Sequence, residues 1–192
     1  MTAVFHRRSL DIEVVETASA DEFGVLGHLR DERPWQDDPM YRVLHDMRIE
    51  LRVDTTTMTI TSATSQMDTF PHAECPFVVD RFGDLVGLSV ARGYSRSLRS
   101  VFGGVTGCAH LYELARAAGS AIVQGTLSRG QATGQRSMAD PESIKRGLTG
   151  MCHIWDADGP GPVKLDLGWR PGAVREYPAP TVERLRESPR NR

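Results

Sequence analysis

Residues 45–54, His-Asp-Met-Arg-Ile-Glu-Leu-Arg-Val-Asp, decide the fold class of this chain. Apolar side chains occupy every second position and alternate with charged ones: Met47, Ile49, Leu51 and Val53 lie on one side. This period of two is typical of an antiparallel strand with one buried and one solvated face. The alternation places His45 on the apolar side and Asp46 on the opposite side.

Three further segments extend this strand into a sheet. The short turn Thr55-Thr56 leads into a threonine-rich strand over residues 58–66, which predicts a hairpin. Upstream, residues 10–14 and 23–29 alternate in the same way and predict a second hairpin. Residues 31–39 between the hairpins contain two prolines and several acids, and indicate a solvated connection. We therefore predict about four antiparallel strands.

The period of the apolar residues then changes from two to between three and four. Short helices are expected over residues 75–82, where Pro76 suits the first helical position, and over residues 93–102. A longer helix begins at Cys108 and ends near Gly125, with a buried face formed by Leu111, Leu114, Ala115, Ala118 and Ile122. We expect an α+β fold with the helices packed on one face of the sheet, followed by a late hairpin that pairs residues 151–155 with residues 163–167.

Length and charge limit the range of functions. The 192 residues suit one α+β domain over residues 1–170, followed by an arm rich in proline and arginine over residues 171–192. The net charge of −2 does not favour nucleic acid or an anionic membrane as a partner. Neither a signal peptide nor a long apolar run is present, so we expect a cytoplasmic protein. Three widely spaced cysteines do not suit a disulfide framework.

The best candidate for chemistry is the segment from Gly103 to Leu114, where glycines lead into a cysteine that opens a helix. A helix N-terminus carries unpaired N–H groups and a partial positive charge, and both favour the thiolate form of Cys108. This makes Cys108 a candidate nucleophile or metal ligand. The alternative is that Cys108 is a buried, inert side chain packed against glycines.

Several motifs resemble one uncharacterised bacterial family, catalogued as domain of unknown function 2889. They are His45-Asp46-Met47, Phe70-Pro71 followed by Cys75-Pro76, Leu85-Val86-Gly87-Leu88, Gly103-Gly104, and Gly107-Cys108-Ala109-His110-Leu111. The resemblance covers most of residues 7–156. Ala109 and Tyr112 replace two threonines of the family motif. The resemblance places the chain with this family but implies no reaction.

The order of elements is also similar to that of iron–sulfur scaffold proteins of the IscU, SufU and NifU type. This resemblance implies metal ligands at His45 or Asp46, at Cys75 and at Cys108. The first of these positions lacks the cysteine of those scaffolds. The resemblance therefore implies a zinc or iron site with nitrogen, oxygen and sulfur ligands rather than an assembled cluster. On the helix, His110 lies about 200° round from Cys108 at roughly 3.6 residues per turn, so we expect it to act as an acid–base group. Glu113 is the other candidate for this role.

Two functions follow from this reading. The preferred one is a small metalloenzyme that acts on a small organic molecule, with His110 or Glu113 as the acid–base group. The alternative is a carrier or scaffold that passes a metal ion, sulfur or an iron–sulfur cluster to a partner protein. A metal-free enzyme with Cys108 as nucleophile and His110 as base requires the two side chains to touch, and their spacing on one helix argues against contact. The sequence decides neither whether the protein is an enzyme nor its oligomeric state.

Overall fold

The computed structural model describes residues 3–133, 141–170 and 178–188. The chain divides into two compact units, residues 1–128 and residues 129–192, and each is described by itself. The sequence instead places the boundary at residue 170, between a single domain and a C-terminal arm. Residues 178–188 of that arm are described and include the helix α6 (Val182–Glu187).

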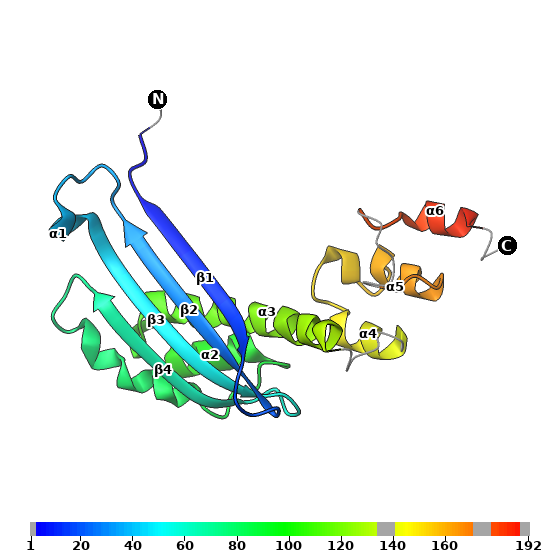
Figure 1. Ribbon diagram of the computed structural model, residues 1–192, viewed down its shortest axis with the longest axis horizontal. Helices are drawn as coiled ribbons and strands as arrows, with labels where there is room; N and C mark the ends of the chain where they lie inside the picture. The colour runs from blue at the N-terminus through cyan, green and yellow to red at the C-terminus, as the bar shows by residue number, and fades with distance from the viewer. Residues whose placement is uncertain (1–2, 134–140, 171–177, 189–192) are drawn as a thin grey trace. The chain divides into compact units, whose positions relative to one another are not determined.

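A four-stranded antiparallel sheet with the strand order β1-β2-β3-β4 forms the first unit (Figure 1). The strands are β1 (Arg7–Glu16), β2 (Glu22–Glu32), β3 (Val43–Asp54) and β4 (Ile60–Thr69). The predicted antiparallel sheet of four strands is thus confirmed, with the two predicted hairpins formed by β1–β2 and β3–β4. The hairpins themselves pair through β2 and β3, where Leu29 lies opposite Met47.

Helices cover one face of this sheet, as predicted. Figure 1 shows α2 (Tyr94–Phe102) and α3 (Ala109–Ala132) on the same side of the strands. The other helical elements of this unit are short: α1 (Pro39–Arg42) and the 3-10 helices η1 (Cys75–Val78), η2 (Asp80–Leu85) and η3 (Gly104–Thr106). No helix in the described parts of the chain is long and apolar enough to cross a membrane.

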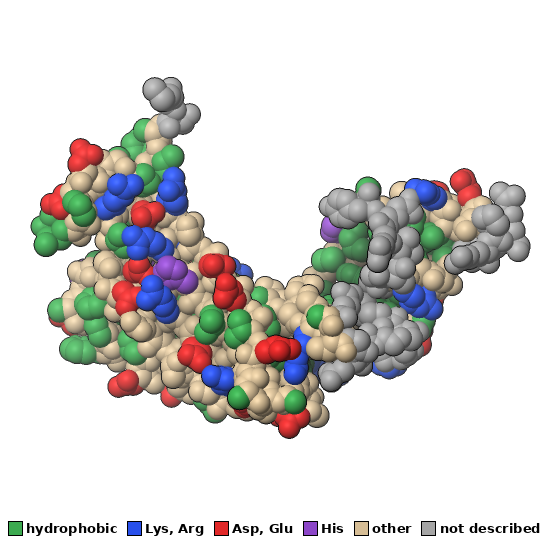
Figure 2. All heavy atoms as spheres, viewed as in Figure 1, with side chains coloured by type: hydrophobic (Ala, Val, Ile, Leu, Met, Phe, Trp, Pro, Cys, Tyr) green, Lys and Arg blue, Asp and Glu red, His purple; other side chains and the backbone are tan. Residues whose placement is uncertain are grey.

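The core lies between the sheet and these helices. Alternate residues of β2 and β3, such as Val25 and Leu51, are fully buried in one cluster with Leu111 and Leu114 of α3 and Phe102 of α2. The opposite face of the sheet is exposed and carries acidic and basic side chains (Figure 2). It forms an open hollow of about 570 Å³, lined by residues that include Asp11, Glu13, His28, Arg48, Glu50 and Gln66. The sheet therefore has one apolar and one charged face, as its alternation predicts.

The described part of the second unit is helical. Besides α6 it contains α4 (Pro141–Leu148), the 3-10 helix η4 (His153–Trp155) and α5 (Pro160–Asp166). The predicted late hairpin is therefore wrong: residues 151–155 include a 3-10 turn, and residues 163–167 lie mostly in α5. The prolines explain the error, because Pro160 sits at the start of the helix, where its fixed φ favours a helical turn and its missing N–H costs nothing.

Candidate active site

Three polar side chains form a row across the helix-covered face of the sheet. In the strand register, Arg8 of β1 lies opposite Asp31 of β2, and Asp31 lies opposite His45 of β3. Directly opposed residues in an antiparallel sheet point to the same face. His45 therefore lies on the apolar side, as its alternation predicts. Asp31 is only 1% exposed, so a carboxylate is buried at one end of the core.

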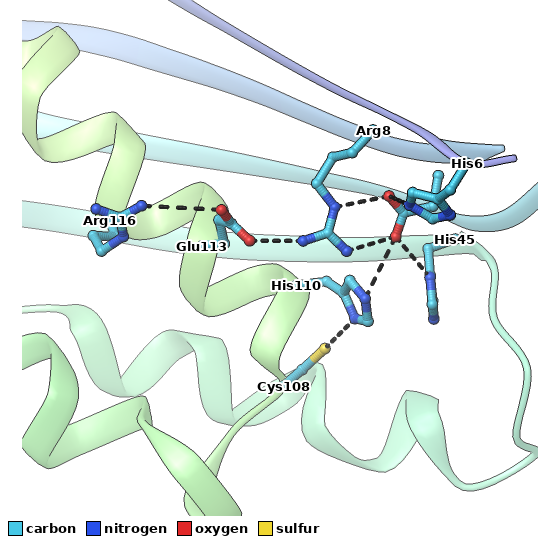
Figure 3. A network of polar contacts seen from close by, with 8 residues as sticks. His6, Arg8, His45, Cys108, His110, Glu113 and Arg116 are labelled. Atoms are coloured by element: carbon cyan, nitrogen blue, oxygen red, sulfur yellow. Dashed lines mark hydrogen bonds and ion pairs between the residues drawn. The ribbon is translucent and has the colours of Figure 1, made fainter. Parts of the chain in front are cut away.

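The Asp31 carboxylate is the centre of the site, and its partners His6, Arg8, His45 and His110 are labelled in Figure 3. Its Oδ1 accepts hydrogen bonds from Arg8 Nε at 2.7 Å and from His6 Nε2 at 3.2 Å. Its Oδ2 accepts from a terminal guanidinium nitrogen of Arg8 at 2.7 Å and from His45 Nδ1 at 2.9 Å. Burial alone would raise the pKa of Asp31, but the hydrogen bonds from Arg8 and His45 outweigh it and lower the pKa from 3.8 to about 2. Asp31 is therefore ionised at neutral pH.

His110 connects this carboxylate to Cys108. The Nε2 atom of His110 lies 3.5 Å from Asp31 Oδ2, and its Nδ1 atom lies 3.8 Å from Cys108 Sγ. An ionised carboxylate can only accept hydrogen bonds, so the tautomer with the proton on Nε2 is favoured, which leaves Nδ1 free to accept from the thiol. Burial, followed by the charges of His45 and Arg8, lowers the pKa of His110, so the ring is neutral at pH 7.

The expectation that Cys108 and His110 point in different directions is wrong. Cys108 precedes α3, and its carbonyl accepts the hydrogen bond from Tyr112 N at 2.8 Å, which is the role of the residue that caps a helix. Its backbone therefore does not follow the helix, and the angle of about 200° expected from 3.6 residues per turn does not apply. The side chain of Cys108 points toward the His110 ring instead (Figure 3).

The glycines before Cys108 shape this approach. A Cβ atom on Gly107 would lie 2.1 Å from the carbonyl oxygen of Phe102, so only glycine fits there. Gly104 has a φ of +61°, a conformation that favours glycine. These two residues let the chain turn through η3 and enter α3 close to the end of α2. The turn brings Cys108 to the end of the sheet where Asp31 lies.

Two further features complete the cluster. The rings of His45 and His110 lie one over the other, with centroids 3.7 Å apart and planes tilted by 30°. Glu113, one turn after His110 on α3, accepts from Arg8 at 2.8 Å and lies 3.9 Å from Arg116. Arg8 thus bridges two carboxylates. The predicted acid–base role of Glu113 stays a prediction, and in this geometry its carboxylate holds Arg8 in place.

The other predicted ligands do not belong to this cluster. Asp46 is 7% exposed but faces the open side of the sheet, where it pairs with His28 at 2.7 Å and with Arg30. Burial alone would raise the pKa of Asp46, but the hydrogen bond from His28 and the charges of His28 and Arg30 lower it. Cys75 is half-buried in η1, and among the described residues its side chain makes no hydrogen bond or ion pair. Cys152 is exposed in the second unit.

The described residues contain one group of three side chains that could hold a metal ion. It consists of Asp31, His45 and His110, whose ligand atoms all lie within 4.8 Å of one another. Of the predicted ligands, only His45 belongs to this group. Cys108 borders it through His110, and neither Cys75 nor Asp46 is part of it.

Asp31, Arg8 and His6 were not among the residues predicted from the sequence. Asp31 had a detectable signal, because it continues the odd-numbered series Phe23, Val25 and Leu29, so an acid lies on the apolar face of its strand. Arg8 continues the even-numbered series Leu10, Ile12 and Val14 in the same way, and His6 lies two residues before it, but whether these side chains meet Asp31 depends on the register between β1 and β2.

Comparison with protein families adds one finding. A family model matches residues 6–124, which include all the residues of the cluster. The chain belongs to this family, described as a protein of unknown function (DUF2889). No curated protein and no solved structure matches the chain. The likeness to iron–sulfur scaffold proteins therefore stays a prediction.

Proposed function

We propose that this DUF2889 protein is a thiol-dependent enzyme that transfers or hydrolyses acyl groups of a small organic substrate. Cys108 is the nucleophile, His110 the general base, and Asp31 the group that orients His110. The observation that carries the proposal is the chain of contacts from Cys108 Sγ to His110 Nδ1 at 3.8 Å and from His110 Nε2 to Asp31 Oδ2 at 3.5 Å. A nucleophile, a base within reach and a third group behind the base form the arrangement used for covalent catalysis on many unrelated folds.

The reaction proceeds in two steps. His110 Nδ1 takes the thiol proton as Cys108 Sγ attacks the substrate carbonyl carbon, and the protonated His110 then gives this proton to the leaving group as its bond to the carbonyl breaks. The product of this step is a thioester on Cys108. A water molecule, deprotonated by His110, attacks the thioester carbonyl and releases the acid, and the proton returns to the thiol. Asp31 stays ionised and stabilises the His110 imidazolium in both steps.

The start of α3 supports the charge that develops on the substrate. The first N–H groups of an α-helix have no partner within the helix and point out of its N-terminus. Those of Ala109 and His110 follow directly after the nucleophile, so they are suited to bind the oxyanion of a tetrahedral intermediate. The proposed setting is the cytoplasm, where thiols stay reduced.

A covalent intermediate provides the test. With 4-nitrophenyl acetate we expect a burst of one 4-nitrophenolate per protein molecule and one acetyl group on Cys108, detected by peptide mass spectrometry. Cys108→Ser removes both signals, whereas the matched control Cys152→Ser, which changes an exposed cysteine of the second unit, keeps them. Acetylation of Cys152 alone, or equal reactivity of wild-type and Cys108→Ser protein, would refute the proposal.

A metal-dependent enzyme is the second candidate, and the group of Asp31, His45 and His110 favours it. One carboxylate and two imidazoles are a ligand set that zinc and iron use, with further positions left for water or substrate. The bound ion would supply Lewis-acid or water-activating chemistry. The contact of Arg8 with Asp31 Oδ2 at 2.7 Å counts against this candidate, because a cation would have to displace a guanidinium from its ligand oxygen.

Two variants separate these candidates. His45→Ala removes a metal ligand but leaves the contacts between Cys108, His110 and Asp31, so it should abolish metal binding and retain the thiol reaction. Cys108→Ser should abolish the thiol reaction and retain metal binding. Metal binding is measured by elemental analysis of the purified protein, together with its absorption spectrum. Acid-labile sulfide with a cluster spectrum would instead support a carrier or scaffold, for which Cys75 and Cys108 remain the proposed sulfur donors.

A further inference from the structure

Exposed apolar side chains adjoin the proposed site. Thirteen large hydrophobic residues of the described chain are exposed, and six of them lie in segments that adjoin or connect residues of the cluster: residues 4–5, 35–41 and 105. Phe5 precedes His6, and Val105 precedes Cys108 by three residues. The connection between Asp31 and His45 contains Trp35, Met40 and Tyr41. Single exposed apolar residues are ordinary, but a gathering of this kind marks a binding surface.

Two contacts fix part of this apolar rim next to the catalytic groups. Trp35 Nε1 donates to the carbonyl oxygen of Phe5 at 2.9 Å, and the neighbouring His6 contacts Asp31 at 3.2 Å. Trp35 is nevertheless 55% exposed and Phe5 75% exposed, so the faces of both rings remain available. Figure 2 shows hydrophobic side chains at this end of the sheet, around the N-terminal segment and α1. The rim therefore continues the site and is not a separate patch on the fold.

We infer that the substrate carries an apolar acyl chain or an aromatic acyl group, which the rim of Phe5, Trp35, Met40 and Tyr41 binds. This inference rests on the proposed function, because the rim is assigned to the acyl group whose carbonyl carbon reaches Cys108. Trp35 is bonded to Phe5, and the next residue, His6, contacts Asp31, so the rim adjoins the polar cluster that contains Cys108. Ligand sites typically combine an apolar, aromatic lining with a few polar groups at the reacting centre, which is the composition found here. Large aromatic side chains contribute most to such binding.

Binding without reaction tests the inference separately from catalysis. We would titrate the Cys108→Ser protein with N-methylacetamide and N-methylhexanamide, two neutral amides that differ by four methylene groups. Full burial of one methylene improves affinity by about fourfold. For an open rim that buries part of the chain, we expect the longer amide to bind at least about tenfold more tightly. Phe5→Ala or Trp35→Ala should reduce this ratio by at least about threefold, whereas Met151→Ala, which changes an exposed apolar residue of the second unit, should leave it unchanged.

The outcomes are distinguishable. A preserved chain-length ratio in Cys108→Ser, together with a wild-type protein that forms no acyl intermediate, would uphold the apolar subsite and refute the thiol mechanism. Equal affinity for the two amides, or a ratio that Trp35→Ala leaves unchanged, would overturn the inference. A dimer that Trp35→Ala dissociates in sedimentation would assign the rim to a second copy of this chain. Co-sedimentation with phosphatidylcholine vesicles that requires Trp35 would assign it to a lipid surface. Either of these results also overturns the inference.

Discussion

The ionised carboxylate of Asp31 should be both a stabilising and a catalytic feature, and Asp31→Asn tests both properties. The pKa of Asp31 falls from 3.8 to about 2 on folding. At about 1.4 kcal/mol per pKa unit, this difference contributes about 2 kcal/mol to the free energy of unfolding at neutral pH. For a chain of this size, such a loss lowers Tm by about 4–8 °C. This difference already contains the loss of the contact between Asp31 and Arg8, since that contact is the main cause of the lowered pKa.

The sign of the pH dependence follows from the lowered pKa. Stability that depends on ionised Asp31 is complete well above pH 3.8, and it is lost as the pH falls toward about 2. About half of the contribution should be lost by pH 3. The difference in unfolding free energy between wild-type and Asp31→Asn protein should therefore shrink as the pH falls from 7 to 3.

Urea denaturation at each pH provides the measurement. Trp35 emission in a background of Trp155→Phe and Trp169→Phe reports only on the unit that contains the site. Asp46→Asn is the matched control, because Asp46 is a second buried carboxylate with arginine and histidine partners but faces the opposite side of the sheet. It should lower stability in the same direction yet keep the acylation of Cys108, which Asp31→Asn should abolish. Unchanged stability of Asp31→Asn at pH 7, or acylation of Cys108 at the wild-type rate, would refute this reasoning.

Two further predictions concern how the site is built and how it titrates. Gly107→Ala should destabilise the protein by about 1–3 kcal/mol and slow acylation of the thiol, because the new Cβ would lie 2.1 Å from Phe102 O. Urea denaturation measures the loss of stability. Gly83→Ala is the control, because no atom lies within 4 Å of its new Cβ. The rate of thiol alkylation by iodoacetamide should fall as His110 becomes protonated, with a midpoint below pH 6.5 in the wild-type protein, since burial and nearby cations lower the pKa of His110. His45→Ala removes the ring whose charge contributes to this shift and should move the midpoint upward; a midpoint that stays in place would contradict the assigned coupling between the two rings.

The candidate site was predictable only in part. Cys108 and His110 share one local segment, and the glycines with the opening of a helix mark that segment as reactive. The periodicity of an α-helix nevertheless predicts that the two side chains point in different directions, because it assumes that Cys108 belongs to the helix. The hydrogen bond from Tyr112 N to the Cys108 carbonyl shows that Cys108 caps the helix instead. A capping residue has its own φ and ψ values, which a periodicity argument cannot supply.

The alternation in residues 45–54 is a property of the chain alone, since successive side chains of any strand point to opposite faces. It determined the sheet, its buried side and the position of His45 on that side. Which residues meet His45 was decided only in the folded protein. Arg8, Asp31 and His110 come from two other strands and a helix, and a shift of one residue in either strand pairing would turn Arg8 or Asp31 to the opposite face. A strand's faces are set locally, whereas register and helix docking depend on contacts between distant parts of the chain.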